Sequence, residues 1–122
     1  MTILVADDNV LSRELIRELL ESSGHVILEA SDGREALELI RSRLPDLVFL
    51  DLQMPVRDGF SVIRELRNDD RFRELPVVAV TSSAMMGDRE RVIAAGFDSY
   101  IAKPIDLCQI EVQVEVLASR SR

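Results

Sequence analysis

Five short apolar runs alternate with segments of helical periodicity, and this alternation limits the possible folds more than any other feature. The sequence predicts strands over residues 3–6, 26–29, 47–50, 77–80 and 99–102. The first, third and fourth runs are apolar at every position, which is typical of strands covered on both faces. Because a helical segment follows each run, we expect an α/β fold: a doubly wound, five-stranded parallel sheet with right-handed crossovers and helices on both faces.

The segments between the runs carry apolar residues at helical spacing. Helices are predicted to start at Leu11 and stop at Gly24, and then over residues 31–45, 60–67, 88–95 and 107–118. In the first, the apolar stripe is expected to consist of Leu11, Leu15 and Leu19 with Ile16 and Leu20 alongside.

The last predicted helix is apolar on two sides, which indicates a second buried contact. One face holds Leu107, Ile110, Val114 and Leu117. Val112 and Val116 lie on nearly the opposite side, so they are candidates for an interface with another protein.

Length, charge and cysteine content bound the class of protein. A chain of 122 residues is about one domain, so we expect a single domain over residues 1–122. With 15 basic and 22 acidic residues the net charge is -7, which argues against nucleic-acid binding and favours proteins or cations as partners. Cys108 is the single cysteine and cannot form an internal disulfide. There is neither an 18-residue apolar run nor a basic leader, so we expect a cytoplasmic location and no membrane partner.

Polar residues close four of the predicted strands at the same edge of the sheet. They are Asp7 and Asp8 after the first strand, Asp51 after the third, Thr81 after the fourth and Lys103 after the fifth. Each alone could be a capping residue, but ligand sites on such sheets collect at the carboxyl ends of the strands. Two carboxylates about 4 Å apart repel by roughly 4 kcal/mol at an effective dielectric constant near 20, so the cluster needs cations. One lysine does not balance three acids, and oxygen ligands favour Mg²⁺.

Four motifs identify a resemblance that covers essentially the whole chain: "ILVADDN", "DLVFLDLQMPVRDGF", "PVVAVTSSAM" and "GDRERVIAAGFDSYIAKPID". With them the chain resembles the receiver domain of two-component response regulators, and in motif it is closest to receivers that stand alone or belong to hybrid histidine kinases. The resemblance implies a flavodoxin-like sheet with strand order 2-1-3-4-5.

The resemblance also implies a role for each strand-end residue. Asp51 would be the phosphoacceptor, with Lys103 and Thr81 binding the phosphoryl group. For Mg²⁺, the family implies direct ligation by Asp8, the Asp51 carboxylate and the backbone carbonyl of Gln53, and contact through water for Asp7. Thr81 and Tyr100 would form the conformational switch, and the Lys103–Pro104 bond would be cis. By the same resemblance, Gln53 and Ser83 occupy positions that tune phosphoryl lifetime in the family.

The function expected from the resemblance is that of a phosphorylated switch rather than an enzyme, although it would slowly hydrolyse its own aspartyl phosphate. Its partners would be a histidine kinase or histidine phosphotransfer protein and a downstream protein target. A homodimer is possible through the fourth helix, fifth strand and fifth helix, including Tyr100, Val112 and Val116. Two alternatives stay open: a receiver excised from a hybrid histidine kinase or other multidomain regulator, and a metal-dependent phosphatase of the haloacid dehalogenase type. The phosphatase ranks low because such enzymes have an acid where this chain has Gln53.

Overall fold

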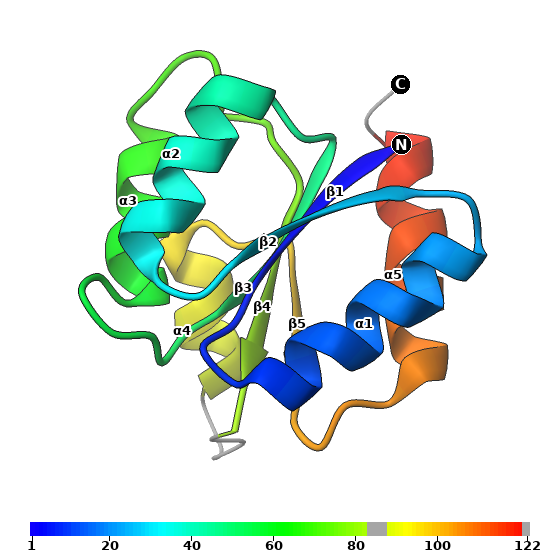
Figure 1. Ribbon diagram of the computed structural model, residues 1–122. Helices are drawn as coiled ribbons and strands as arrows, with labels where there is room; N and C mark the ends of the chain where they lie inside the picture. Colours follow the sequence, from blue (N-terminus) through cyan, green and yellow to red (C-terminus); the bar gives the residue numbers. More distant parts are fainter. Residues whose placement is uncertain (83–87, 121–122) are drawn as a thin grey trace.

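The computed structural model describes residues 1–82 and 88–120, in which strands and helices alternate along the chain (Figure 1). The strands are β1 (Thr2–Ala6), β2 (Val26–Ala30), β3 (Leu47–Asp51), β4 (Val77–Thr81) and β5 (Ser99–Ala102). The helices are α1 (Val10–Ser22), α2 (Gly33–Arg43), α3 (Gly59–Arg67), α4 (Asp88–Ala95) and α5 (Leu107–Arg120). All five predicted strands are confirmed, and no strand end differs from its prediction by more than one residue.

The strands form one sheet in the order β2-β1-β3-β4-β5, and every neighbouring pair is parallel. This is the predicted flavodoxin-like order. The chain first moves outward from β1 to β2, and then crosses back to β3 on the other side of β1. The reversal brings the carboxyl ends of β1 and β3 side by side, which is where ligands bind on sheets of this kind.

Alternate residues of each central strand face two separate hydrophobic cores, one on each side of the sheet. Leu4, Val48 and Ala79 lie in the core under α2, α3 and α4. Ile3, Phe49 and Val78 lie in the core under α1 and α5. Figure 1 shows the same division, with α1 and α5 on one face of the sheet and the other three helices opposite. Helices on both faces explain why these strands are apolar throughout.

The structure corrects two details of the predicted helix faces. Leu11 and Leu15 are exposed, and the buried residues of α1 are Ile16 and Leu20. Leu107, assigned to the inner face of α5, is also exposed because it is the first residue of that helix. In α1, steps of three and four left two possible faces, and the position of the sheet decided between them.

Two observations concern the membrane and cysteine expectations. In the ranges 1–82 and 88–120, no helix combines the length and the apolar character needed to cross a membrane. Cys108 is a free, exposed cysteine. The single domain over residues 1–122 stays a prediction.

Candidate functional site

Asp51 is a buried carboxylate at the end of the central strand β3. Its residue is 3% exposed, and β1 and β4 flank the strand on either side. The backbone N–H of Gln53 donates to Asp51 Oδ1 at 2.9 Å, which fixes one carboxylate oxygen. Because the strand is held on both edges, the position of this carboxylate is set by the sheet rather than by a mobile loop.

Two more acids follow the neighbouring strand β1. Asp7 is 2% exposed, and its Oδ1 accepts a hydrogen bond from the backbone N–H of Asn9 at 2.9 Å. Asp8 is exposed. One carboxylate oxygen from each of Asp7, Asp8 and Asp51 lies within 4.8 Å of the other two. The predicted convergence of the three acids is therefore confirmed.

Lys103 supplies positive charge to this cluster. Its Nζ lies 3.3 Å from Asp51 Oδ2 and 3.1 Å from Asp7 Oδ2. The Lys103–Pro104 peptide is cis, as expected. Despite its ion pair with Lys103, the buried Asp7 Oδ2 accepts no well-aligned hydrogen bond from any described residue. Such an oxygen usually has a further partner, so this atom has capacity to bind a cation.

The surroundings shift the acid–base properties of the cluster. Burial raises the pKa of Asp51 to about 6, and the neighbouring Asp7 adds to the rise, while the Gln53 N–H and Lys103 oppose it. Burial lowers the pKa of Lys103, but its contacts with Asp7 and Asp51 outweigh burial and leave that pKa raised. The result is a charged lysine beside acids that are costly to ionise together.

The donor set fits a hard divalent cation. Three carboxylates converge, two of them buried, and one ammonium does not neutralise them. All the side-chain donors are oxygens, which suits Mg²⁺ better than softer metals. Asp7, Asp8 and Asp51 are therefore the residues that would hold the ion.

The other predicted site residues lie around this centre. Thr81 is buried at the end of β4, and it lines a cavity of about 270 Å³ together with Gln53, Phe60 and Arg91. Ser82 Oγ donates to Gln53 Oε1 at 3.1 Å. Ser83 lies outside the described residues.

Tyr100 and the two valines of the predicted interface lie away from the acids. Tyr100 in β5 is half-buried against the core under α4. Val112 and Val116 of α5 are 53% and 50% exposed. Tyr100, Cys108 and Val112 line one cavity of about 230 Å³.

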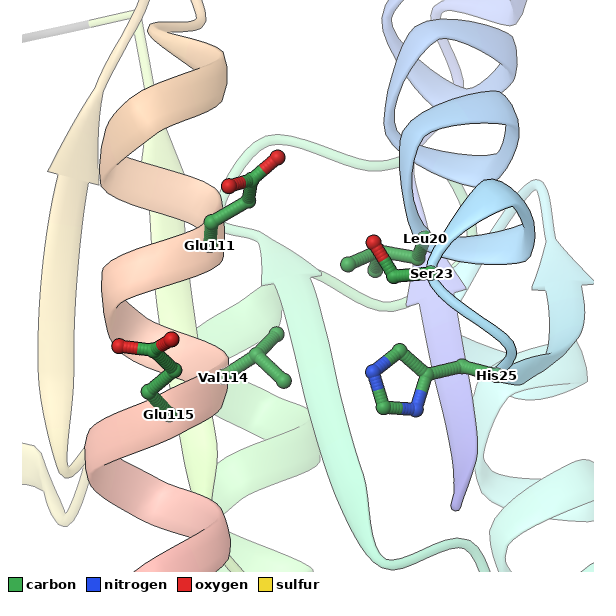
Figure 2. Close-up of a pocket in the computed structure, with 6 residues that line it drawn as sticks. All are labelled: Leu20, Ser23, His25, Glu111, Val114 and Glu115. Carbon is green, nitrogen blue, oxygen red and sulfur yellow. The ribbon is translucent and has the colours of Figure 1, made fainter.

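His25 lies immediately before β2, at the opposite end of the strands from the acid cluster. It lines a cavity of about 140 Å³ between the end of α1 and α5, and Figure 2 shows its ring facing Val114 and Glu115. Its Nδ1 is 3.2 Å from the amino group of Met1. Burial and the Met1 charge lower the pKa of His25.

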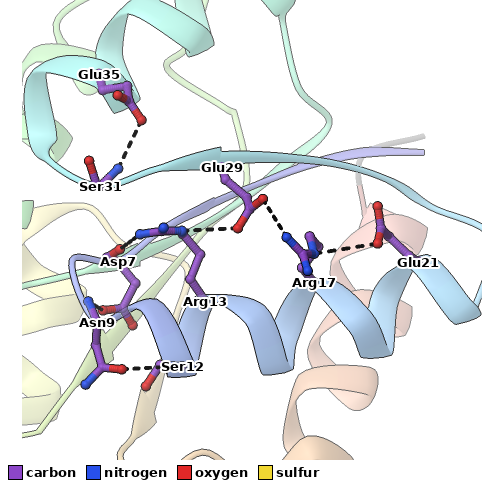
Figure 3. A network of polar contacts seen from close by, with 9 residues as sticks. All are labelled: Asp7, Asn9, Ser12, Arg13, Arg17, Glu21, Glu29, Ser31 and Glu35. Atoms are coloured by element: carbon purple, nitrogen blue, oxygen red, sulfur yellow. Dashed lines mark hydrogen bonds and ion pairs between the residues drawn. The ribbon is translucent and has the colours of Figure 1, made fainter.

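Some residues around the site were not predicted from the sequence. Arg13 of α1 donates to the backbone oxygen of Asp7 at 2.7 Å and is paired with Glu29 of β2 (Figure 3). The one sequence signal was Glu29 itself, a charged residue at the end of an otherwise apolar run. Its partner could not be found without knowing how α1 lies against β2.

Comparison with known proteins gives a consistent result. The family model for the response regulator receiver domain matches residues 3–115. The polar-differentiation response regulator DivK of Brucella anthropi is 42% identical over 106 residues, which cover 87% of this chain and 86% of the relative. DivK of Brucella ovis is 41% identical over the same coverage.

Solved structures agree with the sequence relatives. A Francisella response regulator receiver domain superposes with a TM-score of 0.93 at 29% identity, covering 99% of this chain and 98% of the other. The receiver domain of a sensor histidine kinase from Pseudomonas aeruginosa superposes with a TM-score of 0.85 at 30% identity, covering 96% of this chain and 97% of that one. In the Pseudomonas structure a magnesium ion is coordinated in the active site cleft.

Proposed function

This chain belongs to the response regulator receiver domain family, and on that basis we propose that Asp51 accepts a phosphoryl group from a phosphohistidine. The donor would be a histidine kinase or a histidine phosphotransfer protein. The observation that carries the proposal is the buried Asp51 carboxylate, held at a strand end within reach of Lys103 and beside two further acids.

In the proposed transfer, an Asp51 carboxylate oxygen attacks phosphorus. An O–P bond forms as the P–N bond to the donor histidine breaks, and the electron pair of that bond returns to the imidazole nitrogen. Asp51 must be ionised to attack, and a pKa of about 6 leaves roughly nine in ten molecules ionised at pH 7. Water attack on the acyl phosphate would later restore the carboxylate, so slow self-hydrolysis is part of the proposal.

The other residues of the site would act by positioning and charge, as phosphoryl transfer requires. Lys103 would move from its contact with Asp51 to the phosphoryl oxygens, and Thr81 would donate its hydroxyl to them. Asp8, Asp51 and the Gln53 carbonyl would hold Mg²⁺ directly, and Asp7 would do so through water. The ion would supply positive charge that offsets the carboxylates and the incoming phosphoryl group.

We include an output surface in the proposal. Tyr100 and Thr81 would form the switch, and Tyr100, Val112 and Val116 would contact a downstream protein or a second copy of the chain. Support comes from the two half-exposed valines and from the cavity shared by Tyr100 and Val112. Val112→Asp should weaken partner binding or dimerisation in pull-down and sizing assays, with Val26→Asp, an exposed valine on β2, as control.

Phosphotransfer profiling tests the proposed function. Purified histidine kinases, phosphorylated on histidine, are mixed with the chain, and transfer of label is followed with and without Mg²⁺. We expect rapid Mg²⁺-dependent transfer from a cognate kinase to the chain and none to Asp51→Asn. Release of phosphate from small external esters instead would favour the phosphatase alternative. The cytoplasmic location stays a prediction.

A further inference from the structure

Arg13 bridges the acid-bearing loop and the neighbouring strand. Its Nη1 donates to the backbone oxygen of Asp7 at 2.7 Å, and its Nε donates to Glu29 Oε1 at 3.1 Å (Figure 3). The Arg13 side chain is only 16% exposed, so water competes little for these contacts. One planar guanidinium thus ties α1 to both β1 and β2.

The carbonyl that Arg13 binds belongs to the peptide group between Asp7 and Asp8. Because a peptide group is planar, a hydrogen bond to this oxygen restrains the orientation of the whole plane. The two acids sit on either side of it, so the bond restrains their carboxylates relative to each other. Other contacts of Asp7 fix other atoms: its N–H donates to Ala30 O at 3.0 Å, its Oδ1 accepts from the N–H of Asn9, and its Oδ2 lies 3.1 Å from Lys103 Nζ.

Glu29 is itself held in place, which makes the bridge rigid. In the sheet it lies opposite Val5 of β1, and Arg17 Nη1 donates to its Oε2 at 3.0 Å. Arg17 also lies 3.7 Å from Glu21, one helical turn further along α1. Arg17 therefore shares the carboxylate of Glu29 with Arg13, but its contacts with Glu29 and Glu21 do not include the Asp7–Asp8 peptide group.

From these contacts we propose that Arg13 is a positioning residue for the metal site, which sets the relative placement of Asp7 and Asp8 through the peptide group that joins them. The inference rests on the proposed function, because it assumes that these acids bind Mg²⁺. Partners of metal ligands that do not touch the metal commonly contribute about 10- to 100-fold to metal affinity.

If Arg13 acted through its charge alone, removing it would change the Mg²⁺ affinity in the opposite direction. Arg13 is a cation near the acids, so removing its charge would by itself strengthen binding of a dication. Loss of positioning weakens binding, because the Asp7–Asp8 peptide plane is released. The direction of the change therefore separates the two roles.

Isothermal titration calorimetry with MgCl₂ measures the effect without any phosphoryl transfer. The unmodified protein is compared with Arg13→Met, Arg13→Lys and Arg17→Met. Arg17→Met is the matched control, because it removes one positive charge from the same helix and a contact with the other carboxylate oxygen of Glu29, but leaves the hydrogen bond to Asp7 O. We expect Arg13→Met to bind Mg²⁺ about tenfold more weakly, Arg13→Lys to recover part of the loss, and Arg17→Met to stay within about twofold of the unmodified protein.

Other outcomes overturn the inference. Positioning is refuted if Arg13→Met binds Mg²⁺ as tightly as the unmodified protein or more tightly. It is also refuted if Arg13→Met loses no more Mg²⁺ affinity than Arg17→Met does. Either result leaves the proposed function intact. Failure of the unmodified protein to bind Mg²⁺ would instead overturn the metal site itself. Circular dichroism checks folding. If Arg13→Met does not fold, Arg13→Lys takes its place, because it keeps the charge: a role in charge alone predicts unchanged Mg²⁺ affinity, and positioning predicts a loss of about threefold or more.

Discussion

Lys103 Nζ lies 3.3 Å from Asp51 Oδ2, although 51 residues separate the two positions in the chain. The contact joins β3 to the segment after β5, across the end of β4. It places the only ammonium group of the described acid cluster against the carboxylate proposed to accept phosphate. The cost of keeping Asp51 ionised depends on this pair, and so does the reactivity that we propose for Asp51.

Lys103→Met should slow phosphorylation of Asp51 by about 100-fold, which is the usual effect of removing one charge-stabilising donor from an active site. The loss of the ammonium should also raise the pKa of Asp51 further, because Lys103 lowers it. The measurement is the initial rate of labelling by phosphoramidate in excess Mg²⁺, with Lys103→Arg retaining part of the rate. Equal rates for Lys103→Met and the unmodified protein would contradict the role of Lys103.

Asp51→Asn should stabilise the metal-free protein at neutral pH. The folded-state pKa of Asp51 is raised from 3.8 to about 6, so the folded state binds its proton more tightly than the unfolded state does. The stability contributed by the protonated form is fully present below about pH 4 and is lost as the pH rises through about 6. The substitution should therefore raise the free energy of unfolding by about 3 kcal/mol at pH 7.

Denaturant unfolding at a series of pH values, in the presence of a chelator, checks this effect. The difference between Asp51→Asn and the unmodified protein should shrink as the pH falls from about 6 to about 4. Added Mg²⁺ should stabilise the unmodified protein more than the variant, because the variant lacks a proposed ligand. A difference that does not change with pH would mean that ionisation of Asp51 costs no stability.

Gly59→Ala should impair phosphorylation more than it impairs folding. A Cβ at Gly59, the first residue of α3, would lie 2.8 Å from the backbone oxygen of Asp51 and 2.9 Å from Cα of Leu52, so the end of β3 would have to move. We expect a labelling rate at least about tenfold lower per folded molecule, because small displacements of an in-line nucleophile are costly.

Gly24→Ala provides the matched control. This variant also replaces a glycine by alanine. Gly24 has a φ of +91°, and nothing lies within 4 Å of the added Cβ. It should cost about 1 kcal/mol of stability and leave the labelling rate unchanged. Similar rates for both variants would show that the close approach of Gly59 to β3 does not matter for the site.

Arg67→Met should destabilise the fold by about 3 kcal/mol, because it removes the donor of several partly buried hydrogen bonds and one partner of a partly buried ion pair. Arg67 at the end of α3 donates to the backbone oxygens of Phe72, Arg73, Leu75 and Gly96 and to the carboxylate of Asp98. Thermal and urea unfolding measure the loss. Arg71→Met, which removes an exposed ion pair with Asp69, should change stability by less than about 0.5 kcal/mol.

Sequence patterns predicted the parts of this molecule that depend on strand order. Once the runs were assigned to one parallel sheet, the positions of Asp7, Asp51 and Lys103 at the same edge followed from chain direction alone. The face of α1 did not follow, since Leu15 and Ile16 are both apolar and only contact with the sheet buries Ile16. Arg13 and Arg67 were missed because their partners lie on other elements, at distances in sequence that no local pattern fixes.

The identity of the phosphorylated residue is best measured by tandem mass spectrometry of the chain after brief labelling with acetyl phosphate and Mg²⁺. We predict a single phosphoryl group on Asp51, absent when Mg²⁺ is chelated and absent from Asp51→Asn. A phosphoryl group on another residue, or equal labelling of Asp51→Asn, would contradict the role assigned to Asp51.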